Sequence, residues 1–362
     1  MPDLRSLLLA LLLAVGSVAA PTAQPVPLDS LARAVAEAEG LPSLVVGVSV
    51  GGERWVVGVG DADSTRAAPD AHTLYEIGSI SKVLTSLALA DAVARGETTL
   101  ATPVADLLPD SFAVGAHAAG PIRLVDLATH TSGLPRLDLG MGMSPGFDLA
   151  NPYAAYGVAR LATFLATVTP ATAPGATYLY SNAGAGLLGY ALAQRAGTPY
   201  ADLVADRVLE PLGMGETWVD VPDAHAARFV DGHGPDGAPV PHWTWTAPTV
   251  GAGGWRSSAS DLLTLAEATM DPDATPLAAA LALTLAPHAP IEGVRQMGLG
   301  WHLFPLSDGR TMAAHDGGTG GFVSFLAVVP AAGVAVVVLT NRQASVDAFA
   351  VDLVRRLAAA AD

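Results

Sequence analysis

Apolar residues follow a strand-like pattern near both ends of this 362-residue chain. The runs are short, rich in β-branched residues and interrupted by Gly or Pro: Leu44 to Val50 and Arg54 to Val59 around Gly51-Gly52, then Phe322 to Val329 and Val334 to Leu339 around Pro330 to Gly333. Such runs, separated by a few turn residues, are typical of β-hairpins. We therefore predict one hairpin near each end of the chain.

Other apolar positions recur with helical spacing. Leu31 to Glu39 predicts a helix that stops at Gly40, Ile80 to Arg95 a helix that stops at Gly96, and Val346 to Ala360 a closing amphipathic helix. From Gly96 to about residue 290 the chain is rich in Ala and Leu and broken by Pro and Gly, which favours helix and loop.

The order of these elements predicts the fold class. Strands at both ends with helices between them indicate an α+β (α/β) fold, in which an antiparallel sheet built from both chain ends is flanked by helices. We expect one domain over residues 24–362. Its sheet region would cover about 24–78 and 296–362, and an inserted, mostly helical region about 79–295.

The first 23 residues have the pattern of a signal peptide. Arg5 precedes an apolar run from Leu7 to Ala20, and Ala23 offers a small residue for cleavage. The run is shorter than the ~20 apolar residues of a spanning helix. We expect an exported protein, periplasmic or secreted, without a stable membrane span.

Composition excludes several classes of function. The chain has no cysteine, so thiol catalysis, disulfides and thiolate metal sites are excluded. Its formal net charge of −16 disfavours binding to nucleic acid. The histidines show no metal-ligand spacing such as H-E-x-x-H, so we predict no metal and no cofactor. The expected partner is a small-molecule or peptide substrate with a reactive acyl group.

One lysine stands out by its position. Lys+Arg total 18, and Lys82 is the only lysine, so 18 − 1 = 17 of these residues are arginine. A buried amine can lose its proton, whereas a guanidinium in a protein cannot. Ser79 lies three residues earlier, on the same face of a helix that begins here. Serine needs a base to become nucleophilic, which makes Ser79 a candidate nucleophile and Lys82 its candidate base.

Two later segments extend the Ser79-x-x-Lys82 motif: Tyr180-Ser181-Asn182, and His315-Asp316-Gly317-Gly318-Thr319-Gly320-Gly321-Phe322, which runs into a predicted strand. In order and spacing the three segments resemble the motifs of class C β-lactamases and of the related penicillin-binding proteins and esterases. Further family-like stretches lie between about Leu44 and Asn341: Leu74 to Ser79, Leu127 to Pro135, Pro174-Gly175, and Gly253-Gly254 through Asp261-Leu262.

The resemblance implies roles for matching residues. Tyr180 would move a proton between the nucleophile, the leaving group and water, and Asn182 would bind the substrate's amide or acyl side chain. The backbone N–H groups of Ser79 and Gly318 would form the oxyanion hole. Gly317 would leave space for the acyl group.

His315 departs from the class C β-lactamase pattern, which usually has lysine at this position. With histidine at this position the segment resembles that of many peptidases and esterases of the same family. Its reference pKa is about 6.5. If protonated His315 binds an anionic group, KM for a carboxylate-bearing substrate should rise between about pH 6 and 8.

The sequence leaves the substrate open. The resemblance implies a serine acyl-hydrolase that forms a Ser79 acyl-enzyme and acts on β-lactams or D-alanyl peptides. A carboxylesterase of the same family is the alternative, and a non-catalytic penicillin-sensing module is an alternative of another class. Trp243, Trp245 and Trp255 could line a substrate cleft or fill the core.

Two motif matches and one histidine favour structural interpretations. Gly47 to Gly51 matches a nucleophile elbow but lies in a predicted hairpin. Gly184 to Gly189 matches a dinucleotide fingerprint without a preceding strand, so we expect tight helix packing there. His130 lies in a turn-like segment and is expected to be structural.

Overall fold

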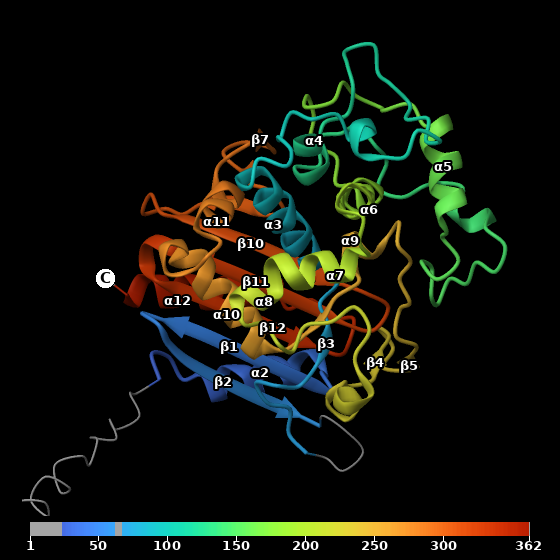
Figure 1. Ribbon diagram of the computed structural model, residues 1–362. Helices are drawn as coiled ribbons and strands as arrows, with labels where there is room; N and C mark the ends of the chain where they lie inside the picture. Colours follow the sequence, from blue (N-terminus) through green and yellow to red (C-terminus); the bar gives the residue numbers. More distant parts are fainter. Residues whose placement is uncertain (1–23, 62–66, 362) are drawn as a thin grey trace, which may run out of the picture.

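A central antiparallel sheet organises the molecule, seen here in a computed structural model (Figure 1). The structure describes residues 24–61 and 67–361, so the predicted signal peptide (1–23) lies outside the described residues. Within them, eight strands pair in the order β2-β1-β12-β11-β10-β9-β8-β7. The sheet strands are β1 (Ser43–Val50), β2 (Glu53–Gly60), β7 (Ala289–Pro290), β8 (Gln296–Met297), β9 (His302–Pro305), β10 (Thr311–Gly318), β11 (Val323–Val329) and β12 (Val334–Thr340).

Both predicted hairpins are confirmed. β1 pairs antiparallel with β2, and β11 with β12. The N-terminal and C-terminal hairpins then join, since β1 also pairs with β12. The expected antiparallel sheet built from both chain ends is therefore present. The nucleophile-elbow match that begins at Gly47 lies in β1 and in the turn at Gly51.

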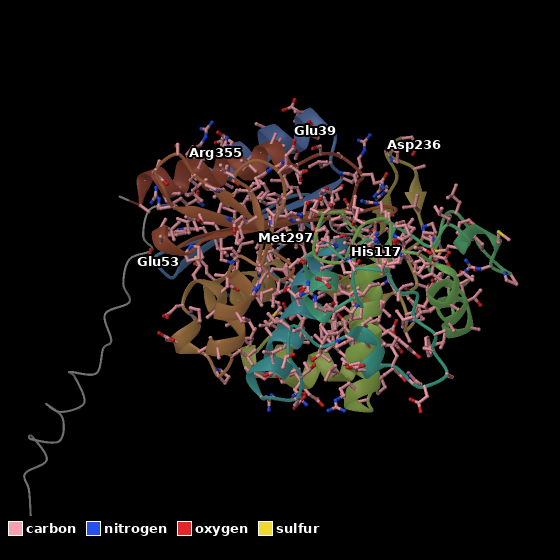
Figure 2. The ribbon with its side chains drawn as sticks, turned by 90° about the horizontal axis from the view of Figure 1, so that it is seen from above. Glu39, Glu53, His117, Asp236, Met297 and Arg355 are labelled. Atoms are coloured by element: carbon pink, nitrogen blue, oxygen red, sulfur yellow. The ribbon has the colours of Figure 1, made fainter. Side chains whose placement is uncertain are left out.

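Alternation along the central strands separates two hydrophobic layers. Val45 and Val337 face one cluster of buried side chains, while Val46 and Val336 face the other. Helices α2 (Leu28–Glu39) and α12 (Asp347–Ala360) cover the second face, and α10 (Ala259–Met270) packs on the first. Figure 2 shows Glu39 and Arg355 at the outer surface of the α2 and α12 layer.

The middle of the chain is largely helical. Its helices are α3 (Ser81–Ala94), α4 (Leu124–Ala128), α5 (Val158–Thr167), α6 (Asn182–Ala196), α7 (Tyr200–Val204), α8 (Glu210–Leu212), α9 (Val250–Gly253), α10 and α11 (Ala278–Leu285). Two small two-stranded sheets accompany them, formed by β3 (Tyr75–Glu76) with β6 (Arg256–Ser257) and by β4 (Gly232–His233) with β5 (Pro239–Val240).

The dinucleotide-like glycines lie inside α6 and permit close packing, as predicted. A Cβ atom on Gly186 would lie 2.4 Å from the carbonyl oxygen of Pro248, and one on Gly189 would lie 3.1 Å from the Cα of Gly251 in α9. This helix contact fixes α6, whose first residue is Asn182, against the segment that carries Ala252.

Candidate active site

Ser79 lies in a short 3₁₀ turn, Gly78–Ile80, that leads directly into α3. Two features hold this turn against the end of β10. Ser324 Oγ in β11 donates a hydrogen bond to the carbonyl oxygen of Ile77 at 2.8 Å. Gly78 adopts φ 48°, and a Cβ atom there would lie 2.6 Å from the backbone N of Gly318. The nucleophile candidate is therefore fixed beside a strand end whose N–H groups are close.

Lys82 is buried one turn later, and its amine is directed at Ser79. Its Nζ lies 2.8 Å from Ser79 Oγ and 2.6 Å from the carbonyl oxygen of Ala252. Burial lowers the pKa of Lys82 well below its ordinary value, and the charge of Arg136 lowers it further, while Asp316 opposes the shift. The amine is thus favoured in its neutral form, which can accept a proton.

Tyr180 completes this group. Its ring centroid lies 4.9 Å from Lys82 Nζ, and its hydroxyl is close enough to Ser79 for the serine to affect the pKa of the phenol. Burial raises the pKa of Tyr180 above its ordinary value, although the Ser79 contact opposes the shift. The phenol is therefore neutral near pH 7, which suits proton transfer rather than a permanent phenolate base.

The segment around Tyr180 is held by local contacts. Ser181 caps α6, since its Oγ accepts the N–H of Gly184 at 2.9 Å. The N–H of Ser181 donates to Nδ1 of buried His130 at 3.1 Å, and the His130 and Tyr180 rings are 4.3 Å apart. His130, the only non-glycine with positive φ among the described residues, thus fixes the Tyr180 segment, in keeping with the structural role expected for it.

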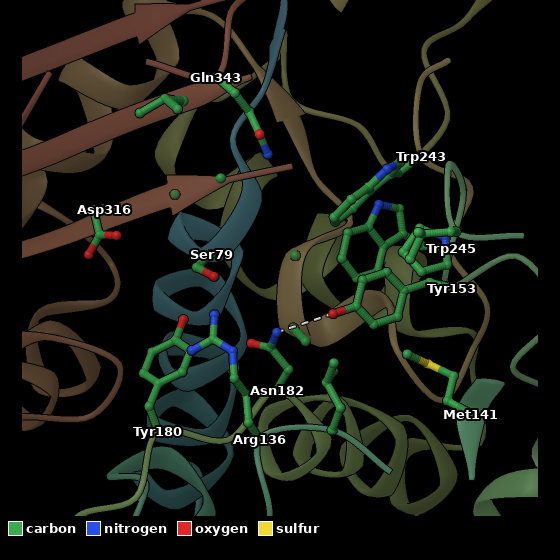
Figure 3. A pocket seen from close by; sticks show the side chains of 18 of the residues that line it. Ser79, Arg136, Met141, Tyr153, Tyr180, Asn182, Trp243, Trp245, Asp316 and Gln343 are labelled. Atoms are coloured by element: carbon green, nitrogen blue, oxygen red, sulfur yellow. Dashed lines mark hydrogen bonds between the residues drawn. The ribbon is translucent and has the colours of Figure 1, made fainter. Parts of the chain in front are cut away.

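Asn182 faces the cleft beside Tyr180. Its Nδ2 donates to the Tyr153 hydroxyl at 3.1 Å. Its Oδ1 is buried and has no hydrogen-bond partner among the described residues. Tyr153 therefore fixes the amide plane, and Oδ1 is a buried acceptor without a partner among the described residues (Figure 3).

Gly317 and Gly318 are the last two residues of β10, just before the chain turns into β11. Gly317 lines the cleft, but a Cβ atom there would lie 2.1 Å from the carbonyl oxygen of Ile77. The space that glycine leaves is filled by protein rather than by an acyl group, so our explanation for Gly317 changes. Gly318 is exposed, and a Cβ atom there would lie 3.9 Å from its nearest neighbour, the carbonyl oxygen of Phe322.

His315 lies on the core-facing side of β10 and is 1% exposed. Its Nδ1 lies 2.6 Å from the backbone oxygen of Asp316, and its Nε2 has no partner among the described residues. Burial lowers the pKa of His315 well below its ordinary value, and neighbouring His302 and Lys82 lower it further. A protonated His315 between pH 6 and 8 is therefore disfavoured, and with it the predicted change in KM.

A cleft of about 930 Å³ is lined by Ser79, Tyr180, Asn182, Gly317 and Gly318 (Figure 3). One wall is aromatic: Tyr153 stacks on Trp245 with ring centroids 4.2 Å apart, and Trp243 meets Tyr153 edge-on at 5.5 Å. Trp243 and Trp245 thus line the cleft, whereas Trp255 is buried in the core and donates to the Tyr200 hydroxyl.

A buried ion pair anchors the aromatic wall to the segment that carries Ser79. Glu76 Oε1 lies 3.0 Å from a guanidinium nitrogen of Arg256. The same oxygen accepts the backbone N–H of Trp243 at 2.9 Å. Because Glu76 is only three residues before Ser79, the wall and the nucleophile candidate share one support.

Sequence reasoning missed several cleft residues, among them Arg136, Tyr153, His302 and Asp316 as a charged lining residue. Arg136 directly follows the family-like stretch that ends at Pro135, so its position was a usable signal. His302 and Tyr153 gave no signal, because their contacts depend on pairing between distant segments. No group of three potential metal ligands occurs among residues 24–61 and 67–361.

The fold and this arrangement of serine, lysine and tyrosine define a serine hydrolase, and comparison with known proteins agrees. The family model described as Beta-lactamase matches residues 28–361. A beta-lactamase of Pseudomonas fluorescens is 29% identical over 347 residues, covering 87% of this chain and 92% of the relative. The D-alanyl-D-alanine-carboxypeptidase/endopeptidase AmpH of Escherichia coli K12 is 28% identical, covering 76% and 72%.

Solved structures agree in fold. The crystal structure of a class C beta lactamase from Rhodobacter sphaeroides superposes with a TM-score of 0.73 at 28% identity and covers 92% of this chain and 97% of its own. Another class C beta-lactamase gives a TM-score of 0.79 at 24% identity, covering 92% and 94%. The chain belongs to the beta-lactamase family and is a serine acyl-hydrolase.

Proposed function

We propose that this protein hydrolyses β-lactams or D-alanyl peptides through an acyl-enzyme on Ser79. The observation that carries the proposal is the buried Lys82 amine, which lies 2.8 Å from Ser79 Oγ and has a lowered pKa. A neutral amine at hydrogen-bond distance is the base that a serine nucleophile requires.

The reaction proceeds in two acyl-transfer steps. Ser79 Oγ attacks the substrate carbonyl carbon while Lys82 Nζ takes the hydroxyl proton, and the N–H groups of Ser79 and Gly318 hold the oxyanion. Tyr180 then donates its proton to the leaving nitrogen and is reprotonated from the Lys82 ammonium. In the second step water attacks the acyl-enzyme carbonyl and its proton passes to the neutral Lys82 amine. As the bond to Ser79 Oγ breaks, the Lys82 ammonium returns that proton to Ser79 and the acid is released.

Relatives support this range of substrates. Two of them are named beta-lactamases and one a D-alanyl-D-alanine-carboxypeptidase/endopeptidase. Both reactions break the bond between a carbonyl carbon and a nitrogen atom, so the same serine, lysine and tyrosine can catalyse either one. We assign binding of the substrate amide to Asn182, because this residue lines the cleft and its Oδ1 has no hydrogen-bond partner among the described residues.

Hydrolysis of a chromogenic cephalosporin tests the proposal, with Ser79→Ala as the blank. Turnover that disappears in the variant supports a Ser79 acyl-enzyme that water releases. Labelling by a fluorescent penicillin without lactam turnover would leave two functions, hydrolysis of D-alanyl peptides and penicillin sensing, which an assay with a D-alanyl peptide distinguishes. The proposal would be refuted if Ser79 were not labelled and the protein turned over neither lactams nor D-alanyl peptides.

A carboxylesterase is the second candidate, and the absence of a fixed positive charge at the end of β10 favours it. His315 is buried and neutral where a fixed cation would bind a substrate carboxylate, and exposed Asp316 lines the cleft next to it. A carboxylate at this end of the cleft would be repelled, whereas a neutral ester would not. Ser79-dependent hydrolysis of short-chain esters, without lactam or peptide turnover, would favour this activity.

We also propose that residues 1–23 direct export and that residues 24–362 form the mature domain, periplasmic or secreted. The proposal is supported by the apolar run after Arg5 and the small residues that follow it. None of the described helices is both long and apolar enough to span a bilayer. Fractionation of expressing cells, with the mature N-terminus determined by mass spectrometry, tests both boundaries.

A further inference from the structure

Arg136 is a cation in the cleft without an ion-pair partner among the described residues. Its side chain is exposed and lines the cleft, and neither an ion pair nor a side-chain hydrogen bond joins it to another described residue. The nearest acidic residue in sequence, Asp138, is held by Arg160 at 2.5 and 2.6 Å. Arg136 therefore leaves all its guanidinium donors available to a ligand.

The backbone of Arg136 is nevertheless fixed. Its carbonyl oxygen accepts the N–H of Asn182 at 2.9 Å and that of Ala183 at 3.2 Å. Its guanidinium carbon lies 5.0 Å from the centroid of the Tyr180 ring, a distance at which a cation is attracted to an aromatic face. The backbone of Arg136 is thus fixed beside Asn182, and its guanidinium lies beside the Tyr180 ring (Figure 3).

The cleft is lined by charges of both signs. Arg136 is the only lysine or arginine among the described residues that line it, and the carboxylates that line it are Asp316 in β10 and Asp347 at the start of α12. An anionic group is attracted towards Arg136 and repelled from the strand end. Planar carboxylates match the guanidinium fork, which can donate two parallel hydrogen bonds.

We propose that Arg136 binds a carboxylate carried by the acyl part of the substrate, beside Asn182, and so determines specificity for anionic acyl groups. The proposal rests on the acyl-transfer function proposed above and adds the class of substrate: an acyl donor with a free carboxylate several bonds from the scissile carbonyl. The carbon chain between the two groups would pass Ser79, Tyr180 and Asn182, which line the cleft together with Arg136.

Two esters with the same leaving group test this assignment: the mono-p-nitrophenyl ester of glutaric acid, which carries a free carboxylate, and p-nitrophenyl pentanoate, which is neutral and has an acyl chain of the same length. Arg136→Gln should lower kcat/KM for the glutarate ester by about 10- to 100-fold, mainly through KM, because a charged hydrogen bond is lost. The pentanoate ester should change by less than about 3-fold. Arg295→Gln is the matched control, since it removes a partnered arginine outside this cleft.

An equal loss of kcat/KM for both esters would mean that Arg136 acts on catalysis by positioning Tyr180, and would overturn the proposal. No loss for either ester would overturn it as well. Ser79→Ala separates the proposed function from this inference, because hydrolysis of both esters must stop in that variant if acyl transfer uses Ser79.

If the native chain hydrolyses neither ester, binding gives the answer without turnover. Glutarate should raise the melting temperature of Ser79→Ala protein and should fail to do so once Arg136→Gln is added. Equal stabilisation of both proteins would refute carboxylate binding by Arg136.

Discussion

Gly78→Ala probes the contact that brings the nucleophile turn and the strand end together. A Cβ atom at this position would lie 2.6 Å from Gly318 N and 2.9 Å from Gly318 O, and contact becomes ordinary only from 3.4 Å. The difference, 3.4 − 2.6 = 0.8 Å, is the separation that the turn and β10 must gain. Because both sides of the contact are backbone, no side-chain rotation can relieve it.

That displacement is enough to break an oxyanion contact. A donor at about 2.9 Å would move to about 3.7 Å, outside hydrogen-bond range. Loss of one oxyanion donor lowers kcat by about 10²- to 10³-fold, or about 2.7–4 kcal/mol. The backbone at φ 48° adds a stability cost of about 1–2 kcal/mol for a residue other than glycine.

Two further variants isolate these effects. Gly96→Ala places alanine at φ 72° with no atom within 4 Å of the new Cβ, so it carries the backbone strain without the contact. Gly318→Ala keeps the proposed N–H donor and meets its nearest atom at 3.9 Å. Both should keep kcat/KM within about 3-fold of the native chain, whereas Gly78→Ala should lose the oxyanion contribution.

The assay is hydrolysis of whichever chromogenic lactam or ester the native chain turns over in a Ser79-dependent manner, with thermal melting measured on every variant. A folded Gly78→Ala protein whose kcat/KM is within about 3-fold of native would refute the close approach of Gly78 and Gly318 as a requirement of the site.

Three more outcomes are expected. Lys82→Arg should lower kcat by about 10²- to 10⁴-fold without preventing folding, because a guanidinium cannot accept the serine proton; retained activity would exclude Lys82 as the base. In the native chain kcat/KM should fall as pH falls through the lowered pKa of Lys82, and should show no loss from Tyr180 ionisation below about pH 10, because burial raises the pKa of that phenol; a pH profile that rises only near the ordinary lysine pKa would contradict this. Arg256→Met should destabilise the fold by about 3–5 kcal/mol in denaturant titration, because Glu76 is 2% exposed and would remain buried without its partner. The control, Arg33→Met, breaks an exposed pair and should cost less than about 1 kcal/mol.

The ends of the chain could be predicted because their patterns are local. β1 and β12 are continuous β-branched runs, and α2 ends where Gly40 adopts the left-handed conformation. β10 did not stand out, since His315, Asp316 and two glycines interrupt its apolar pattern. β7 and β8 have two residues each, too few for any periodicity. Strands of this kind exist only through pairing with their neighbours, which sequence pattern does not encode.

The site divides in the same way. Ser79 and Lys82 could be paired from their helical spacing, and their 2.8 Å contact agrees with it. The burial of His315 was not predictable, because its neighbour Asp316 is exposed and only the register of β10 decides which of the two faces the core. The environment of Arg136 likewise depends on Asn182 and Tyr180, which lie more than 40 residues away in sequence.

The electrostatics of the site explain why base and cation are different residues. Burial lowers the pKa values of Lys82, His130 and His315, and the charge of Lys82 lowers the pKa values of both histidines further. Such a cluster does not favour a permanent charge, which keeps the Lys82 amine available as a base but leaves nothing there to hold an anion. Exposed Arg136 supplies a charge that burial does not remove, and it also lowers the pKa of Lys82. Removing that charge should therefore shift the acid limb of the pH profile upward as well as weaken anion binding. The shift would apply to both esters, whereas the loss of affinity would apply only to the one that carries the carboxylate.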